Sequence, residues 1–511
     1  MSARATAAVL AGLSLVCALL LALPARTVTS AYVNDLLLFL DGAHRVAWGQ
    51  VPNRDFHTAL GLLAYYIPAA GLWVSGQMGG ALPVGMALLI VLFVPLLVHV
   101  LVGRLRPVLA LALGAFLVLV LAAPINLGDS LSSITFAMYY NRIGWVALAL
   151  LAVMYLRPRP QTRLGIWLDA ATAAILVVLL IYLKITYAPV ALAFVIFMLL
   201  DRQQWRWAAL ALLLIAVAMA VVELFWRGSW LYLQDLLETA RVSGQRDPMG
   251  YVYALLRNLS DLLVFGILAG LALTQTRSWR DLLFYIFCSV AGLLILMQNA
   301  HNWGIITLFA GAAVAAETLL RGLEQRGRRL ALSPGAPLLF LFMVLPGLGS
   351  HTVALMSHFT MAVSGWGQPL GLPGLEQVRF GRLWSRGDQG FTEKYIGTFG
   401  AGADALAQAG VVPERVLVLD FANPFSAGLN LAPPKGDLSW MHWGRNINAA
   451  VFVPPEQLFA DVMVVMVPTV GINVGQLEGL YGAYIAQNFV LAGQTELWRV
   501  YVRPPQPGAP A

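Results

Sequence analysis

The sequence predicts an all-α polytopic membrane domain of about eleven transmembrane helices, followed by a small extracytoplasmic α/β domain. Of the 511 residues, 59% are hydrophobic and only 11% are charged, whereas soluble domains have about 25% charged residues. Apolar runs near the roughly 20 residues that a spanning helix needs recur over residues 8–356. Beyond residue 357 these runs give way to Pro-, Gly- and Asn-rich stretches between short strand-like segments.

Eleven apolar runs are expected to form the spanning helices. They cover residues 8–24, 83–103, 107–124, 142–156, 165–183, 186–200, 207–226, 259–273, 281–298, 303–320 and 336–356. A further run, 59–76, is ambiguous because it has spanning length but contains Tyr65, Tyr66 and Pro68.

Arginine placement decides how the ambiguous run is interpreted. If residues 59–76 do not cross, the arginine clusters between the runs all fall on one side, which is then the cytoplasm. These clusters contain Arg4, Arg104, Arg106, Arg157, Arg159, Arg163, Arg202, Arg206, Arg277, Arg280, Arg321, Arg326, Arg328 and Arg329. We therefore expect 59–76 to lie at or dip into the outer interface. The N-terminus is then cytoplasmic, and loops 25–82, 125–141, 227–258 and 299–302 face outward.

The chain divides into a membrane domain, 1–356, and an extracytoplasmic domain, 357–511. Short β-type runs at 416–420, 461–467 and 497–502 predict strands in the second domain. Residues 401–408 and 476–487 are expected to be helices packed beside those strands.

Charge and cysteine content exclude two classes of site. The net charge of +7 is spread over short loops, so no nucleic-acid partner is implied. Cys17 and Cys288 both lie inside apolar runs, which leaves no disulfide framework and no metal-ligand spacing.

The polar stretch from Tyr32 to His57 carries three carboxylates, Asp35, Asp41 and Asp55, directly after the first apolar run. Residues 31–49 have the pattern of an interfacial helix with a polar side. An aspartate that is partly shielded from water can have a raised pKa and act as a general base. The alternative is that these acids solvate the loop or pair with Arg45 and Arg54.

The order of residues here resembles the GT-C superfamily of glycosyltransferases, which includes lipid A aminoarabinose transferases and protein O-mannosyltransferases. The matching segments are Asn34-Asp35, Gly49-Gln50-Val51-Pro52, Arg54-Asp55-Phe56 and Leu63-Ala64-Tyr65-Tyr66. Many members have an acidic pair where this chain has Asn34-Asp35, and Pro-Pro where it has Thr58-Ala59-Leu60. These departures leave the acceptor type and the metal dependence open.

The resemblance implies a chemistry. Asp35 would activate the acceptor as a general base, and Asp55 would position the acceptor or hold a divalent metal ion (Mg²⁺ or Mn²⁺). The donor would be a sugar on polyprenyl phosphate, displaced with inversion. The acceptor would be an extracytoplasmic glycolipid, polysaccharide or protein. Together with the compact loops, the resemblance indicates a bacterial inner (plasma) membrane, with the C-terminal domain in the periplasm or outside the cell.

Such a donor needs cationic groups near its phosphate. Lys184 lies at the outer end of an apolar run, so its ammonium must either extend to the membrane surface or bind an anion. Arg142 is the second candidate for binding the donor phosphate. Tyr139, Tyr140 and His57 are assigned to substrate binding beside them. Arg246 is either a further phosphate ligand or a solvated loop residue. Asn299 and His301 belong to an amide-rich turn that either lines a sugar pocket or is an ordinary turn. Asp129, in another outer loop, is a further metal or acceptor candidate.

Two other classes of protein remain as alternatives. A transporter or flippase of a lipid-linked glycan would usually show internal repeats and charged or broken helices near mid-membrane. The two halves of this chain do not match, and its charges crowd the loops and the run ends. A scaffold without enzymatic activity would not need an acidic interfacial helix in the first loop, but no sequence feature excludes it.

Overall fold

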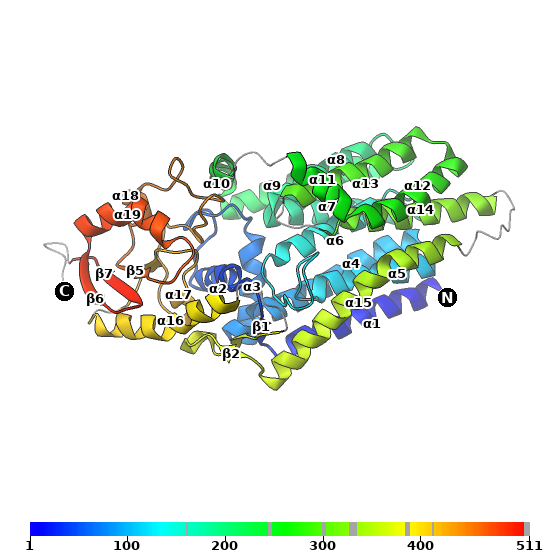
Figure 1. The fold of residues 1–511 in the computed structure, drawn as a ribbon. Coiled ribbons are helices and arrows are strands. Elements are labelled where there is room, and N and C mark those ends of the chain that lie inside the picture. Colours follow the sequence, from blue (N-terminus) through cyan, green and yellow to red (C-terminus); the bar gives the residue numbers. More distant parts are fainter. Residues whose placement is uncertain are drawn as a thin grey trace.

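The structure is a computed structural model of the chain that describes residues 1–159, 162–243, 248–298, 303–325, 335–383, 389–410 and 413–504. Long helices lie side by side along one axis, and a smaller α/β domain sits at one end of them (Figure 1). Among the described residues, eight helical segments are long and apolar enough to cross a membrane. They are α1 (Ala3–Ala22), Met78–Arg104 (η1 and α4, Ala81–Arg104), α7 (Arg163–Leu183), α9 (Trp205–Trp226), α12 (Leu259–Thr276), α13 (Trp279–Gln298), α14 (Ile306–Gln325) and α15 (Gly335–Ser364).

All eleven apolar runs contain helices, so the mostly helical fold class is confirmed, but the number of crossings is not. Three of the runs form helices of only 16, 15 and 11 residues. They are α5 (Pro107–Ala122), α6 (Tyr139–Val153) and α8 (Ala188–Met198), the last preceded by the 3₁₀ turn η2 (Ile185–Tyr187). The last long helix, α15, continues to Ser364, beyond the expected end at residue 356.

Loops that carry arginines meet at one end of the bundle, the end where the N-terminus lies (Figure 1). Ion pairs stabilise this end, most of them between different segments and one within α14. The pairs are Arg104–Asp169 (2.7 Å), Arg157–Asp201 (3.0 Å), Arg280–Asp201 (2.6 Å), Arg321–Glu317 (2.8 Å) and Arg106–Glu317 (3.6 Å). We name this the arginine end, and the opposite end, which carries the α/β domain, the domain end.

Segment 25–82 lies at the domain end and contains α2 (Val33–Ala47), the expected interfacial helix. The ambiguous run 59–76 becomes α3 (Leu63–Ser75), whose 13 residues rise about 20 Å, less than the roughly 30 Å of a bilayer core. Helix α3 crosses α4 very closely, because a Cβ added at Gly71 would lie 2.0 Å from the Ala81 carbonyl oxygen.

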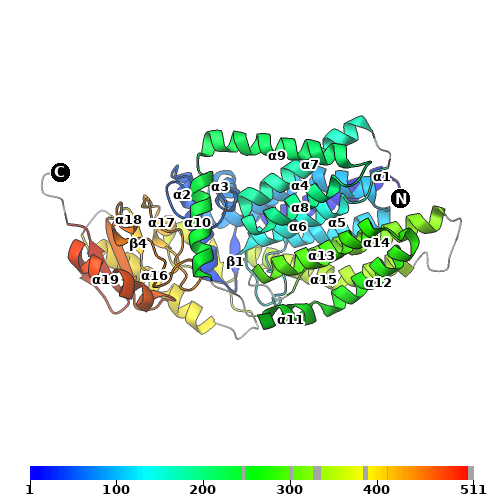
Figure 2. The same ribbon diagram turned by 90° about the horizontal axis from the view of Figure 1, so that it is seen from above.

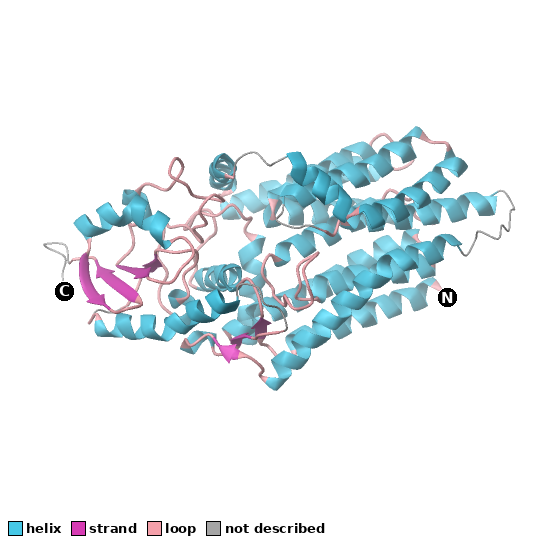
Figure 3. Cartoon of the chain, in the orientation of Figure 1, coloured by secondary structure: helices cyan, strands magenta, loops and turns pink. Residues whose placement is uncertain are grey.

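Two small sheets complete the fold, and Figure 3 shows both toward the domain end. In the first, β1 (Thr27–Thr29) pairs in parallel with β3 (Val378–Phe380), which pairs with β2 (Gln368–Pro369). The sequence gives no prediction of this sheet, because its strands have two or three residues and come from distant segments. The 3₁₀ turn η3 (Pro373–Leu375) lies between β2 and β3.

The second sheet has the order β4-β5-β7-β6 and forms the core of the α/β domain. Strands β4 (Val416–Val418), β5 (Val464–Pro468) and β7 (Trp498–Val502) occupy the three predicted positions, whereas β6 (Val490–Gln494) is additional. Helices α16 (Gln389–Gln408) and α19 (Val474–Asn488) contain the two predicted helices. Two short helices, α17 (Phe425–Leu429) and α18 (Pro455–Leu458), lie in the connections.

Candidate functional site

The structure separates the three acids of segment 25–82 into different roles. Asp41 pairs with the buried Arg45 on the next turn of α2, at 2.6 Å. The Arg45 guanidinium also donates two hydrogen bonds of 2.7 Å to the Asp437 carboxylate, which belongs to the α/β domain. Asp41 is therefore part of a buried ion-pair group that attaches the α/β domain to α2, as the pairing alternative predicted.

Asp55 is also engaged by its surroundings. One carboxylate oxygen accepts a 2.8 Å hydrogen bond from the backbone N–H of Val51, which closes the turn after Gly49. The other lies 3.1 Å from the ammonium of Lys435 in the α/β domain. The expected role of Asp55 as a second site acid gains no support from this geometry, because both oxygens already have partners.

Asp35 differs from the other two acids. It lies in the first turn of α2, half-buried, and none of the described residues donates a hydrogen bond to it. Burial raises the pKa of its carboxyl to about 6, although the nearby Arg445 guanidinium acts in the opposite direction. A half-buried carboxyl with free oxygens and a pKa near neutrality is suited to accepting a proton.

Aromatic packing brings the Asp35 side of α2 against the start of α6. Phe39, one turn after Asp35, packs against the rings of Tyr139 and Tyr140, with centroids 5.1 and 5.7 Å apart. The Lys184 ammonium lies 4.7 Å from the centroid of the Tyr140 ring. It also donates a 3.2 Å hydrogen bond to the side chain of Asn141. Two of the predicted residues, Tyr140 and Lys184, are thus neighbours near Asp35.

Arg445 is the residue that sequence reasoning missed. It is exposed on the loop after Trp440, and its charge acts on Asp35, Tyr140 and His442. Burial and Arg445 together lower the pKa of His442 to about 4, so this imidazole is neutral. We call Asp35, Tyr140, Lys184 and Arg445 the Asp35 cluster.

The loop that carries Arg445 is held by aromatic rings. His442 packs against Phe421 and Trp440, with ring centroids 5.0 and 5.7 Å apart. Nothing local in the sequence links Arg445 to an acid 410 positions earlier.

Arg142 is not brought together with Lys184. Residues 140 and 142 project about 200° apart around α6, so Arg142 faces away from Tyr140. Its guanidinium is buried against the Phe136 ring, 5.7 Å from the centroid. Its nitrogens are closed to water and have no acceptor among the described residues. This geometry gives no support to the predicted phosphate contact of Arg142.

The remaining predicted residues have structural contacts or lie outside the described residues. Tyr139 is buried and donates a 2.6 Å hydrogen bond to the Ala64 carbonyl. His57 bonds to Asp235 at 2.8 Å and to Gln457 at 2.9 Å. Asp129 accepts a 3.2 Å bond from Asn126, and burial raises its pKa. Outside the described residues lie Arg246, Asn299 and His301.

The acids do not form a recognisable metal centre. Within the described ranges, no group of three or more His, Cys, Asp or Glu side chains is arranged to hold a metal ion. Asp55, the acid proposed to hold a divalent ion, directs its oxygens at Val51 and Lys435. The residues present therefore do not fit a divalent cation shared by Asp35 and Asp55.

The chain matches no protein-family model and no curated protein. The residues of the Asp35 cluster and the membrane architecture around them are therefore the basis for any functional proposal.

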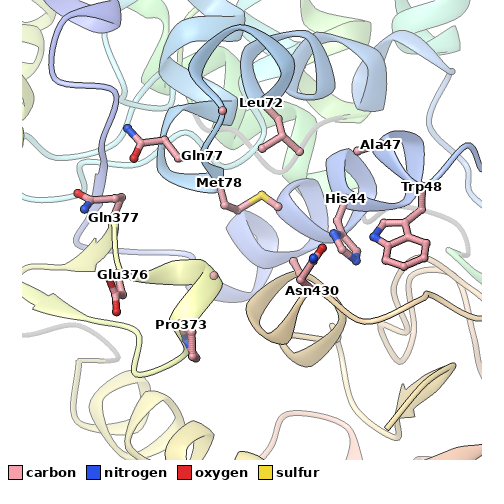
Figure 4. Close-up of a pocket in the computed structure, with 13 residues that line it drawn as sticks. His44, Ala47, Trp48, Leu72, Gln77, Met78, Pro373, Glu376, Gln377 and Asn430 are labelled. Atoms are coloured by element: carbon pink, nitrogen blue, oxygen red, sulfur yellow. The ribbon is translucent and has the colours of Figure 1, made fainter. Parts of the chain in front are cut away.

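A separate cleft of about 880 Å³ opens at the other end of α2 (Figure 4). Met78 and Leu72 lie on one side of it, and His44, Trp48 and Asn430 on another (Figure 4). His44 follows Asp35 by nine residues, which places it about 180° around the helix. None of the predicted site residues lines the cleft, so it is distinct from the Asp35 cluster.

Proposed function

We propose that this chain is a membrane glycosyltransferase that moves a sugar from a polyprenyl-phosphate donor to an acceptor hydroxyl or amine. The domain end would face the periplasm or the outside of the cell, and the arginine end the cytoplasm. The positive-inside rule supports this orientation, because the arginine-bearing loops meet at one end.

One observation carries the proposal: of the three acids in segment 25–82, Asp35 alone has no hydrogen-bond or ion-pair partner among the described residues. Asp41 and Asp55 are both held by cations of the chain, Arg45 and Lys435. Burial raises the pKa of Asp35 to about 6, so the group is mostly ionised near neutral pH and still basic enough to accept a proton.

In the proposed reaction, Asp35 removes the proton from the acceptor O–H or N–H as the acceptor atom attacks the anomeric carbon. The bond between that carbon and the phosphate oxygen breaks, and polyprenyl phosphate departs with the electron pair. The configuration at the sugar carbon inverts, as the GT-C resemblance implies.

The leaving phosphate needs a cation near Asp35. Lys184 fits this role best, since its ammonium lies over the Tyr140 ring. Preorganised positive charge at a leaving group lowers the barrier by stabilising the charge that develops there. Arg445 supplies a second positive charge from the α/β domain, which would make that domain part of the site.

The test is transfer of a radiolabelled sugar from polyprenyl phosphate, measured in membranes containing equal amounts of each variant. Asp35→Asn keeps the size of the side chain but removes the base, and we expect a roughly 10²- to 10⁴-fold loss of rate. Asp55→Asn is the matched control and should retain most of the activity. Equal rates for wild type and Asp35→Asn would refute the assignment of the base. Absence of transfer by wild type from every donor, with movement of lipid-linked glycan across the membrane, would favour the transporter.

A further inference from the structure

Helix α10 (Ser229–Val242) differs from its neighbours in direction. It runs across the domain end, whereas the long helices lie along the bundle axis (Figure 2). Only two residues separate its start at Ser229 from the end of α9 at Trp226. It therefore lies where a spanning helix leaves the bundle.

One face of α10 holds the segment that follows the turn at Pro52. The buried Asp235 carboxylate accepts hydrogen bonds from the Asn53 side chain (2.8 Å), the Thr58 backbone N–H (3.0 Å) and the His57 imidazole (2.8 Å). Three donors on one carboxylate fix residues 53–58 against α10. We name this contact the Asp235 clamp.

The side of α10 away from Asp235 carries exposed apolar side chains. Trp230, Leu233 and Leu237 project between about 160° and 220° away from Asp235 around the helix. Their exposed fractions are 66%, 44% and 52%. A helix with one polar, engaged face and one exposed apolar face is typical of the membrane interface.

The exposed face continues an apolar surface that already belongs to a membrane-spanning helix. Phe225 and Leu224, at the end of α9, are 82% and 71% exposed, and Val221 and Val217 precede them on the same helix. Only Arg227 and Gly228 separate these side chains from α10. The lipid-facing surface of α9 thus passes directly onto α10.

We propose that α10 lies in the headgroup layer of the bilayer at the domain end, with Trp230, Leu233 and Leu237 inserted among the lipids. Its partner is a lipid surface and not a protein. Through the Asp235 clamp, the helix then sets the position of residues 53–58 relative to the membrane. This inference depends on the membrane architecture and not on glycosyl transfer.

The test uses a fluorescent label in nanodiscs. Leu233→Cys carries an environment-sensitive fluorophore, with Phe225→Cys as the lipid-facing reference and Val490→Cys, on β6 of the α/β domain, as the aqueous reference. The native Cys17 and Cys288 are buried and give little background. Phospholipids spin-labelled near the headgroup should reduce fluorescence at 233 as much as at 225, with little loss at 490. The proposal would be overturned if lipid spin labels quenched the fluorophore at position 233 as little as the one at position 490. It would also be overturned if only iodide in the aqueous phase quenched the fluorophore at position 233.

Hydrogen exchange tests the clamp separately. The combined variant Trp230→Ser, Leu233→Ser and Leu237→Ser should leave the interface and speed exchange in the peptide covering residues 53–58. Val490→Ser is the control for an exposed apolar residue elsewhere and should leave that peptide unchanged. Unchanged exchange in the combined variant, with label quenching as expected, would show that α10 binds lipid without positioning the segment.

Discussion

The Asp35 carboxyl lies at the start of a helix, where unpaired backbone N–H groups normally favour the ionised form. Burial outweighs that effect and raises its pKa to about 6. Asp41, two turns later, lies beside the Arg45 guanidinium at 2.6 Å. Two aspartates of one helix thus have opposite chemical environments, and only the first is available as a base.

The proposed base gives the transfer rate a defined pH dependence. Below about pH 6, Asp35 becomes protonated, and the rate should fall about tenfold for each further pH unit, because only the carboxylate accepts a proton. The measurement is a profile of kcat/KM against pH for wild type and Asp35→Asn. The residual activity of Asp35→Asn should not fall in this way at acidic pH. The same fall in both proteins would mean that another group titrates.

His57 gives a second pH effect, on stability. The hydrogen bond to Asp235 raises the pKa of His57, so the protonated form stabilises the folded state. This contribution is complete below the ordinary pKa of about 6.5 and is lost as the pH rises through the raised value. We expect His57→Gln to lower stability by about 1 kcal/mol in acid and by less in alkali. Thermal unfolding across this pH range checks the prediction. A difference in stability between wild type and His57→Gln that increases with pH would contradict it.

Among the elements, the crossing of α3 and α4 has the least room for change. A Cβ at Gly71 would lie 2.0 Å from the Ala81 carbonyl oxygen and 2.5 Å from the Gly85 nitrogen. Both neighbours are backbone atoms, so the two helices would have to separate.

Gly71→Ala should therefore lower the free energy of unfolding by about 1–3 kcal/mol, the usual cost of overpacking. Gly12→Ala in α1 is the control, because nothing lies within 4 Å of its added Cβ. Thermal unfolding in detergent compares the two variants. A Gly71→Ala protein as stable as Gly12→Ala would mean that the helices are not held this closely.

Periodicity and composition predict the elements well where a segment has a strong pattern of its own. Every apolar run became a helix, and three strands of the α/β domain lie where short β-type runs predicted them. Strands β1, β2 and β3 escaped prediction, because each gains its structure only from a distant partner. The same reason decides which residues of the Asp35 cluster could be predicted. Asp35 and Tyr140 could be named from local patterns, whereas Arg445 reaches them only through the packing of the α/β domain.

For the whole molecule, the orientation in the membrane is open to direct measurement. Glu496→Cys lies exposed in the α/β domain, and Arg202→Cys lies exposed at the arginine end. A membrane-impermeant maleimide applied to intact cells should label position 496, and position 202 only after the cells are opened. Wild type is the control, since Cys17 and Cys288 are buried. Labelling of 202 but not 496 in intact cells would reverse the proposed topology.

The pairing of β1 with β3 also has a consequence in time. Thr27 is matched with Val378, a residue made 351 positions later. At the usual speed of synthesis, about 5–20 residues per second, the ribosome needs roughly 20–70 seconds to cover that distance. During this interval the segment that follows α1 has already been translated but lacks its partner strand. The surroundings of Asp35, which include Arg445 of the α/β domain, are likewise completed only after every membrane-spanning helix has been made.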